Sequence, residues 1–191
     1  MKLILTDVDG VLLDWELAFH EWMKERGYKL KEEPSDSYII HHHYNDLTEK
    51  ESKLLVRYFN ESATIGYLKP LRDSIKYVKL LTEKHGYKFN CITSLSSDPY
   101  AYKLRLMNLR SVFGDAINDL VCLDTGADKD EALAPYKDSG LWWIEDKPAN
   151  ADLGHKLGLR SILIEHEHNV DHKCPYPIVE NWSEIYKLIV G

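Results

Sequence analysis

The chain has 191 residues, and its 24 lysines and arginines stand against 31 aspartates and glutamates, which gives a formal net charge of −7. This length suits one compact domain with a small insertion, and 44% hydrophobic residues argue against intrinsic disorder. The negative net charge argues against a domain that binds double-stranded nucleic acid. No apolar run approaches the ~18 residues that a membrane-spanning helix needs.

The cysteines and the first residues indicate a cellular compartment. Cys91, Cys122 and Cys174 are odd in number and scattered, which does not fit a disulfide framework. The first residues lack the long apolar stretch of a signal peptide. We therefore expect reduced thiols in a cytoplasmic protein.

Short apolar runs predict strands that are covered on both faces, as in a parallel sheet. They occupy residues 2–6, 88–92, 120–123, 141–144 and 161–164. Helical patterns lie between these runs; for example, Asp98 before Pro99 predicts the start of a helix that reaches about residue 113. Strands that alternate with helices predict an α/β fold with a doubly wound, mostly parallel sheet.

Residues 14–71 interrupt this alternation, because they contain no convincing strand. Trp15 and Phe19 mark one face of a helix, and Thr48 begins a capping box for a second helix. The polar, histidine-rich residues 32–44 between them are predicted to form a loop. We therefore expect the chain to divide into an α/β core at residues 1–13 and 72–191 and a small helical insertion at residues 14–71.

The residues that follow the predicted strands carry the chemistry, since ligands of open α/β sheets bind at the carboxyl ends of the strands. Four runs are followed by polar side chains: Asp7 and Asp9, Thr93 and Ser94, Asp124 and Lys129, and Glu145 and Asp146. The carboxylates at this edge cannot all stay ionised without a cation, and Mg²⁺ is the divalent ion that suits oxygen ligands. A carboxylate can attack phosphorus, while hydroxyls and a lysine hold the phosphoryl oxygens. Together, the carboxylates, hydroxyls and lysine that follow the predicted strands indicate phosphoryl transfer.

The same residues resemble the haloacid dehalogenase-like superfamily. Residues 7–12 (DVDGVL) are similar to its first motif, Thr93-Ser94 to the second, Lys129 to the third and Glu145-Asp146 to the fourth. The resemblance spans the chain and implies a Rossmann-like core, with residues 14–71 as a small cap of the C1 type. An acid two residues after the nucleophile implies the phosphohydrolase branch rather than the dehalogenating branch.

The resemblance also implies roles for the acidic residues. Asp7 would be the nucleophile and a metal ligand. Asp9 would protonate the leaving oxygen and later activate water, with its backbone carbonyl on the Mg²⁺ ion. Asp146 would complete the metal shell, and Glu145 or Asn150 would act on the metal through water.

Phosphate binding is implied for three further residues. Thr93 would bind the phosphoryl group and Lys129 would neutralise it. Ser94 could share or exchange its role with Thr93, and Lys137 stays open as an alternative to Lys129 because the third motif is poorly patterned here.

A narrower resemblance concerns the substrate. Residues 9–15 (DGVLLDW) and 144–147 (IEDK) are similar to the 5′(3′)-deoxyribonucleotidase, or 5′-nucleotidase type C, group. That group carries an aromatic residue at the place of Trp15, where it packs near the nucleobase. In that group the second motif is usually followed directly by proline, whereas here residues 95–98 precede Pro99. The resemblance implies a nucleotidase that acts on nucleoside monophosphates, with Trp15 as a substrate-binding residue.

Other functions stay open. A phosphatase of another small metabolite would differ only in what the cap recognises, and a phosphatase of nucleic-acid ends would need a basic groove, of which the net charge gives no hint. A phosphate-ligand binding protein on the same scaffold would lack turnover. The expected partner is a small phosphomonoester, foremost a nucleotide, with no duplex nucleic acid and no membrane; a homodimer is also considered.

Histidines gather at two places, in the insertion (His41, His42 and His43) and after the fifth apolar run (His166, His168 and His172, with Cys174). Neither spacing matches a standard zinc pattern. We interpret both groups as solvated loop residues.

Overall fold

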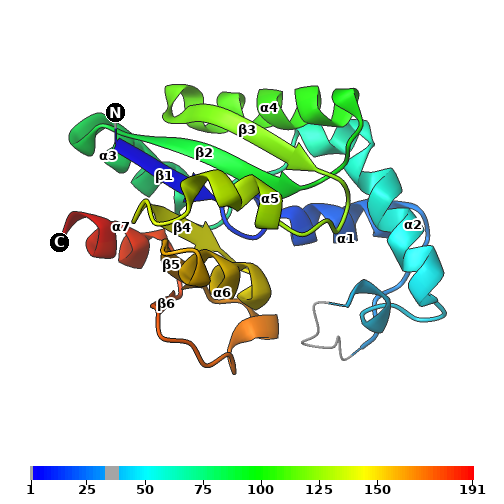
Figure 1. Cartoon of the computed structure of the whole chain (residues 1–191). Helices are drawn as coiled ribbons and strands as arrows, with labels where there is room; N and C mark the ends of the chain where they lie inside the picture. The colour runs from blue at the N-terminus through cyan, green and yellow to red at the C-terminus, as the bar shows by residue number, and fades with distance from the viewer. Residues whose placement is uncertain (1, 33–38) are drawn as a thin grey trace.

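The computed structural model describes residues 2–32 and 39–191. Within them, six strands form one sheet in the order β3-β2-β1-β4-β5-β6, and each neighbouring pair is parallel (Figure 1). The strands are β1 (Lys2–Thr6), β2 (Tyr87–Ser94), β3 (Ile117–Leu123), β4 (Trp142–Glu145), β5 (Arg160–Ile164) and β6 (Ile178–Val179). The strand order reverses at β1, which creates the crevice where ligands of doubly wound sheets bind.

Helices cover both faces of the sheet. One face packs against α3 (Ser74–His85), α4 (Pro99–Phe113) and α7 (Trp182–Val190), and the other packs against α5 (Asp130–Leu133) and α6 (Pro148–Lys156). Side chains alternate between the two faces, since Ile4 belongs to the first hydrophobic cluster and its neighbour Leu5 to the second. None of the described helices is long and apolar enough to cross a membrane.

The predicted α/β fold with a doubly wound parallel sheet is confirmed. Asp98 caps α4 by accepting a hydrogen bond from the Tyr100 amide at 2.7 Å, and Gly86 ends α3 with a φ of 73°. Two local features lie outside these expectations. Lys129 is the N-cap of α5, and the two-residue strand β6 is too short for a periodic pattern to reveal.

The insertion consists of α1 (Trp15–Glu25), α2 (Glu49–Asn60) and two 3₁₀ turns, η1 (Ile40–His42) and η2 (Ala63–Gly66). Figure 1 shows α1 and α2 beyond the end of the sheet toward which the strands point. The remaining 3₁₀ turns belong to the core: η3 (Gly114–Ala116), η4 (Ala134–Tyr136) and η5 (Glu167–Asn169). Residues 33–38 of the predicted loop at 32–44 lie outside the described residues, and Ile40–His42 forms η1.

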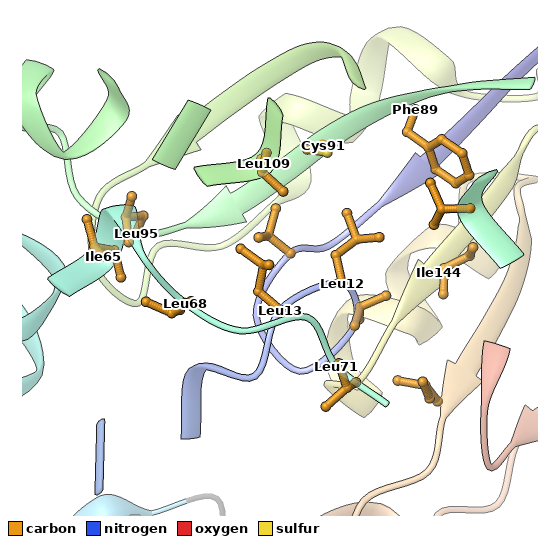
Figure 2. Close-up of a cluster of buried hydrophobic side chains, with 14 of the residues drawn as sticks. Leu12, Leu13, Ile65, Leu68, Leu71, Phe89, Cys91, Leu95, Leu109 and Ile144 are labelled. Atoms are coloured by element: carbon orange, nitrogen blue, oxygen red, sulfur yellow. The ribbon is translucent and has the colours of Figure 1, made fainter. Parts of the chain in front are cut away.

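The hydrophobic core continues from the sheet into the insertion. Figure 2 shows Ile65 and Leu68, at the end of the insertion, beside Leu95 and Leu13 of the core. Phe19 of α1 belongs to the same cluster. The insertion is therefore packed on the core as part of one hydrophobic cluster, and the boundaries at residues 14 and 71 stay a prediction.

Candidate active site

The three central strands deliver polar side chains to one edge of the sheet. Thr6 lies level with Cys91 of β2 and with Ile144 of β4 in the parallel register. The residues that follow each of these positions therefore reach the edge together. They are Asp7 and Asp9 after β1, Thr93 and Ser94 at the end of β2, and Glu145 and Asp146 at the end of β4.

Lys129 lies at the centre of this edge. Its Nζ is 2.8 Å from Asp7 Oδ2 and 2.8 Å from Glu145 Oε2, and the residue is 1% exposed. Burial opposes the charge of this lysine, but the two carboxylates outweigh it and raise the pKa of Lys129 above its ordinary value. The alternative, Lys137, is exposed at the end of η4, so Lys129 is the lysine beside Asp7.

Three carboxylates surround the lysine, more than its single charge balances. Asp7, Glu145 and Asp146 each offer an oxygen, and these oxygens lie within 4.8 Å of one another. Burial raises the pKa of Asp146 to about 7, with repulsion by Asp7 adding to the effect. Burial, followed by repulsion from Glu145, also raises the pKa of Asp7, even with Lys129 alongside. The arrangement favours a bound cation.

Glu145 is completely buried and hydrogen-bonded through both oxygens. Its Oε2 accepts from Lys129, and its Oε1 accepts from the backbone amides of Asp146 at 3.1 Å and Lys147 at 3.0 Å. Glu145 therefore positions both the lysine and the turn that carries Asp146. Asn150, the other residue expected near a metal, is buried in the first turn of α6.

Gly10 allows Asp146 to approach the turn that follows β1. Its φ is +72°, and a Cβ atom there would lie 2.3 Å from Asp146 Oδ2. The Gly10 carbonyl accepts a hydrogen bond from His166 Nε2 at 2.6 Å. His166 thus holds the turn between Asp9 and the insertion, so the interpretation of this histidine as a solvated loop residue is wrong.

Arg105, a buried arginine of α4 with 0% exposure, also belongs to the site, although no motif in the sequence marks it. Its guanidinium forms a two-pronged ion pair with Asp9, in which Nη2 is 3.2 Å from Oδ2 and Nη1 donates to Oδ1. Thr93 Oγ1 donates to the same Oδ2 at 3.4 Å. A signal was present, because Arg105 shares one helical face with Ala101 and Leu109, which are also buried. A charge on a core face needs a partner.

Thr93 and Ser94 have different surroundings. Thr93 is 1% exposed and its hydroxyl contacts Asp9 in the site. The Ser94 hydroxyl instead donates to the Ala127 carbonyl at 2.7 Å. Ser94 therefore fixes the loop that leads to Lys129.

Trp15 is partly buried among aromatic side chains of the insertion. Its ring stacks on Phe19 at 4.8 Å between centroids, with Phe59 at its edge at 5.3 Å. The indole Nε1 donates to Asn60 Oδ1 at 2.9 Å, and Asn60 Nδ2 donates to the Leu95 carbonyl at 2.9 Å. Asn60 thus links Trp15 to the backbone just after Thr93 and Ser94. Its contact with a substrate stays a prediction.

Comparison with known proteins begins with the sequence. No protein-family model matches the chain. One curated relative is an uncharacterised 32.4 kDa protein of the Gp30–rIII intergenic region of Enterobacteria phage T4, which is 25% identical over 155 residues. The match covers 78% of this chain and 55% of the phage protein, so the chain spans about half the length of that relative.

Solved structures match nearly the whole chain. A haloacid dehalogenase-like family hydrolase from Streptococcus pneumoniae has a TM-score of 0.68 at 14% identity, with 99% of this chain and 98% of that chain covered. The L-2-haloacid dehalogenase of Xanthobacter autotrophicus has a TM-score of 0.65 at 10% identity, with 100% and 99% covered. D,D-heptose 1,7-bisphosphate phosphatase from Burkholderia thailandensis has a TM-score of 0.59 at 10% identity, with 100% and 99% covered. The chain therefore has the haloacid dehalogenase-like fold.

Proposed function

We propose that the chain is a Mg²⁺-dependent phosphomonoester hydrolase that works through an aspartyl-phosphate on Asp7. The observation that carries this proposal is the buried Lys129, 2.8 Å from Asp7 and joined there by the carboxylate of Asp146. Similar folds are found in dehalogenases and phosphatases, so the proposal depends on the site and not on the fold.

The donor set fits Mg²⁺. Asp7 and Asp146 would hold the ion through their carboxylates, and Asp9 through its backbone carbonyl, since Mg²⁺ prefers oxygen ligands. Burial, with repulsion by Asp7, raises the pKa of Asp146 to about 7. A cation between these carboxylates would compensate for both effects, because it stabilises their ionised forms. When bound, Mg²⁺ supplies positive charge that polarises the phosphoryl group.

The side chains then divide the reaction. A carboxylate oxygen of Asp7 attacks phosphorus, the bond to the leaving oxygen breaks, and Asp9, which must carry a proton at this step, gives that proton to the leaving oxygen. Asp9 next takes a proton from water, which attacks the phosphorus of the aspartyl-phosphate and releases phosphate and free Asp7. Lys129 remains charged and stabilises the phosphoryl oxygens, while Arg105 and Thr93 orient the carboxylate of Asp9.

Asp9 favours a phosphatase over a dehalogenase. An alkoxide leaving group needs a proton, whereas a halide ion leaves without one. Asp9 lies two residues after Asp7, and its carboxylate is held by the fork of Arg105 rather than exposed as a surface charge. The site thus has a positioned carboxylate that can act on the leaving oxygen once it has taken up a proton, a role that displacement of a halide does not require.

We further propose that the substrate is a nucleoside monophosphate, preferably a deoxyribonucleotide, whose base stacks on Trp15. Trp15 is the first residue of α1 and follows the turn that holds Asp7 and Asp9. Helical side chains point back toward the N-terminus, so we expect an indole at this position to be within reach of a substrate in the site. Stacking on a base is worth about 1–3 kcal/mol by alanine substitution in single-strand binders.

The reaction is tested with a generic aryl phosphate and the Asp7→Asn variant. Asp124→Asn is a matched control, because Asp124 follows β3 at the same edge of the sheet and pairs with Arg57 instead. We expect Asp7→Asn to abolish hydrolysis and Asp124→Asn to retain it, with EDTA removing activity and Mg²⁺ restoring it. Wild-type turnover by Asp7→Asn would contradict the proposal. Release of halide from a 2-haloacid without phosphatase activity would support a dehalogenase instead.

A further inference from the structure

A second cluster of side chains that could hold a metal ion lies in the insertion and shares no residue with the carboxylates of the sheet edge. Glu16, His20 and His43 each offer one donor atom, and these atoms lie within 4.8 Å of one another. His43 is 7% exposed, so its interpretation as a solvated loop residue is wrong. Two imidazoles and one carboxylate form a donor set that suits zinc and related transition ions.

Helix geometry and a short backbone pairing bring the three residues together. Glu16 and His20 are four residues apart on α1 and therefore share one helical face. The segment at His43 returns alongside the residues that follow α1, because the Lys31 amide donates to the His43 carbonyl at 2.9 Å and the Asn45 amide to the Lys29 carbonyl at 3.2 Å. This pairing places His43 against His20, with 5.9 Å between the ring centroids.

His20 is oriented as metal-binding histidines usually are. Its Nδ1 is 2.5 Å from the hydroxyl of Tyr44, a residue that is 2% exposed. When Nδ1 donates its proton to this hydroxyl, the lone pair of Nε2 is directed to the other side of the ring. A hydrogen bond on the second ring nitrogen fixes both the tautomer and the direction of a ligand histidine.

The spacing of the donors also fits a small ion. His20 Nε2 is 3.4 Å from Glu16 Oε1. Two ligands at zinc–ligand distances of about 2.0–2.1 Å in a tetrahedron lie about 3.4 Å apart, so this pair needs no rearrangement.

We propose that Glu16, His20 and His43 bind a Zn²⁺ ion that joins α1 to the segment after η1. This site differs from the one at the sheet edge, whose donors are all carboxylates and suit Mg²⁺. Zinc here would fix the fold of the insertion beside the loop that follows β5. The zinc ion would take no part in the proposed phosphatase reaction.

Zinc binding is measured directly on the whole chain, stripped of metal and then supplied with an excess of Mg²⁺ to occupy the carboxylate site. Equilibrium dialysis gives the number of Zn²⁺ ions bound, and the visible absorption of Co²⁺ used in its place reports the ligand geometry. We expect one Zn²⁺ per chain and a higher melting temperature. Glu16→Gln and His20→Ala should each weaken binding by about tenfold or more.

Glu16→Gln is the decisive variant, because the Glu16 side chain is 56% exposed and its change leaves the packing intact. His42→Ala, one residue before His43, is the matched control and should bind Zn²⁺ like the wild type. Asp7→Asn should also bind it normally. Absence of stoichiometric binding, or binding that Asp7→Asn removes and Glu16→Gln does not, would overturn the proposal. Neither readout depends on catalytic activity, so the two proposals fail separately.

Discussion

The edge of the sheet and the insertion place their polar groups by different means. At the sheet edge, Asp7, Thr93 and Glu145 stand at or just after strand ends, so the parallel register itself brings them together. In the insertion, His20 and His43 lie on segments joined by a short backbone pairing and by packing of aromatic rings. Strand topology can be predicted from a sequence pattern, whereas this kind of packing cannot.

The largest effect is expected at Lys129. Lys129→Met removes the cation between Asp7 and Glu145 and leaves two buried carboxylates without it. Breaking a buried ion pair in this way costs about 3–5 kcal/mol of the free energy of unfolding. We expect urea unfolding to show this loss and the hydrolysis of aryl phosphate to disappear.

Lys137→Met is the control for Lys129, because Lys137 is exposed and should change stability by less than about 0.5 kcal/mol. If both substitutions behave alike, the sheet edge does not depend on a buried lysine. The contrast between the sheet edge and the insertion would then lose its strongest support.

Arg105 tests whether the geometry of Asp9 matters. Arg105→Lys keeps the charge but removes the planar fork that holds both oxygens of Asp9. Losing such a positioning contact should lower kcat for aryl phosphate about 10- to 100-fold with a smaller change in KM. Arg110→Lys, on the exposed side of α4, should leave kcat unchanged. Equal rates for the two variants would show that Asp9 is oriented without Arg105.

Trp15 tests whether the insertion recognises the substrate. Trp15→Ala should lower kcat/KM for a deoxynucleotide about 5- to 150-fold, the equivalent of a lost base stack, and leave aryl phosphate almost unaffected. Trp15→Phe keeps an aromatic face and should retain most of the activity. An equal loss on both substrates would assign Trp15 to its packing with Phe19 and Phe59.

The smallest effect concerns pH and metal. Burial raises the pKa of Asp146 from 3.8 to about 7, so the protonated form is favoured by folding. Its contribution to stability is complete below about pH 4 and is lost as the pH rises through 7. Added Mg²⁺ should therefore raise the melting temperature more at pH 8 than at pH 5, by about 2–4 °C for each kcal/mol gained. A larger gain at pH 5 would contradict this account, and Asp146→Asn should remove the difference.

Much of the fold could be predicted from the sequence because its signals are local. Apolar runs mark the buried strands, and the Asp98–Pro99 pair marks a helix start that the structure confirms. Strand β6 was missed because its two residues carry no periodic pattern. The carboxyl ends of the strands then indicated where polar residues would gather.

The partners of the site residues were harder to predict. Arg105 lies in the middle of α4, on the face that is buried in the core. The sequence pattern indicates that such an arginine needs a partner, but only the packing of α4 shows that the partner is Asp9. The Ser94 hydroxyl donates to the Ala127 carbonyl in a loop that no local signal places nearby, and its contact with phosphate stays a prediction. Such partners depend on how helices and loops pack, which is a property of the whole chain.

The most direct test of the central claim is to trap the phosphorylated chain. Wild-type protein is mixed with Mg²⁺ and aryl phosphate and quenched with acid during turnover, and its peptides are examined by mass spectrometry. We predict a phosphate adduct on the peptide that contains Asp7, and none in the Asp7→Asn variant. Steady turnover by the wild type with no adduct on that peptide, or with the adduct on another residue, would contradict the account.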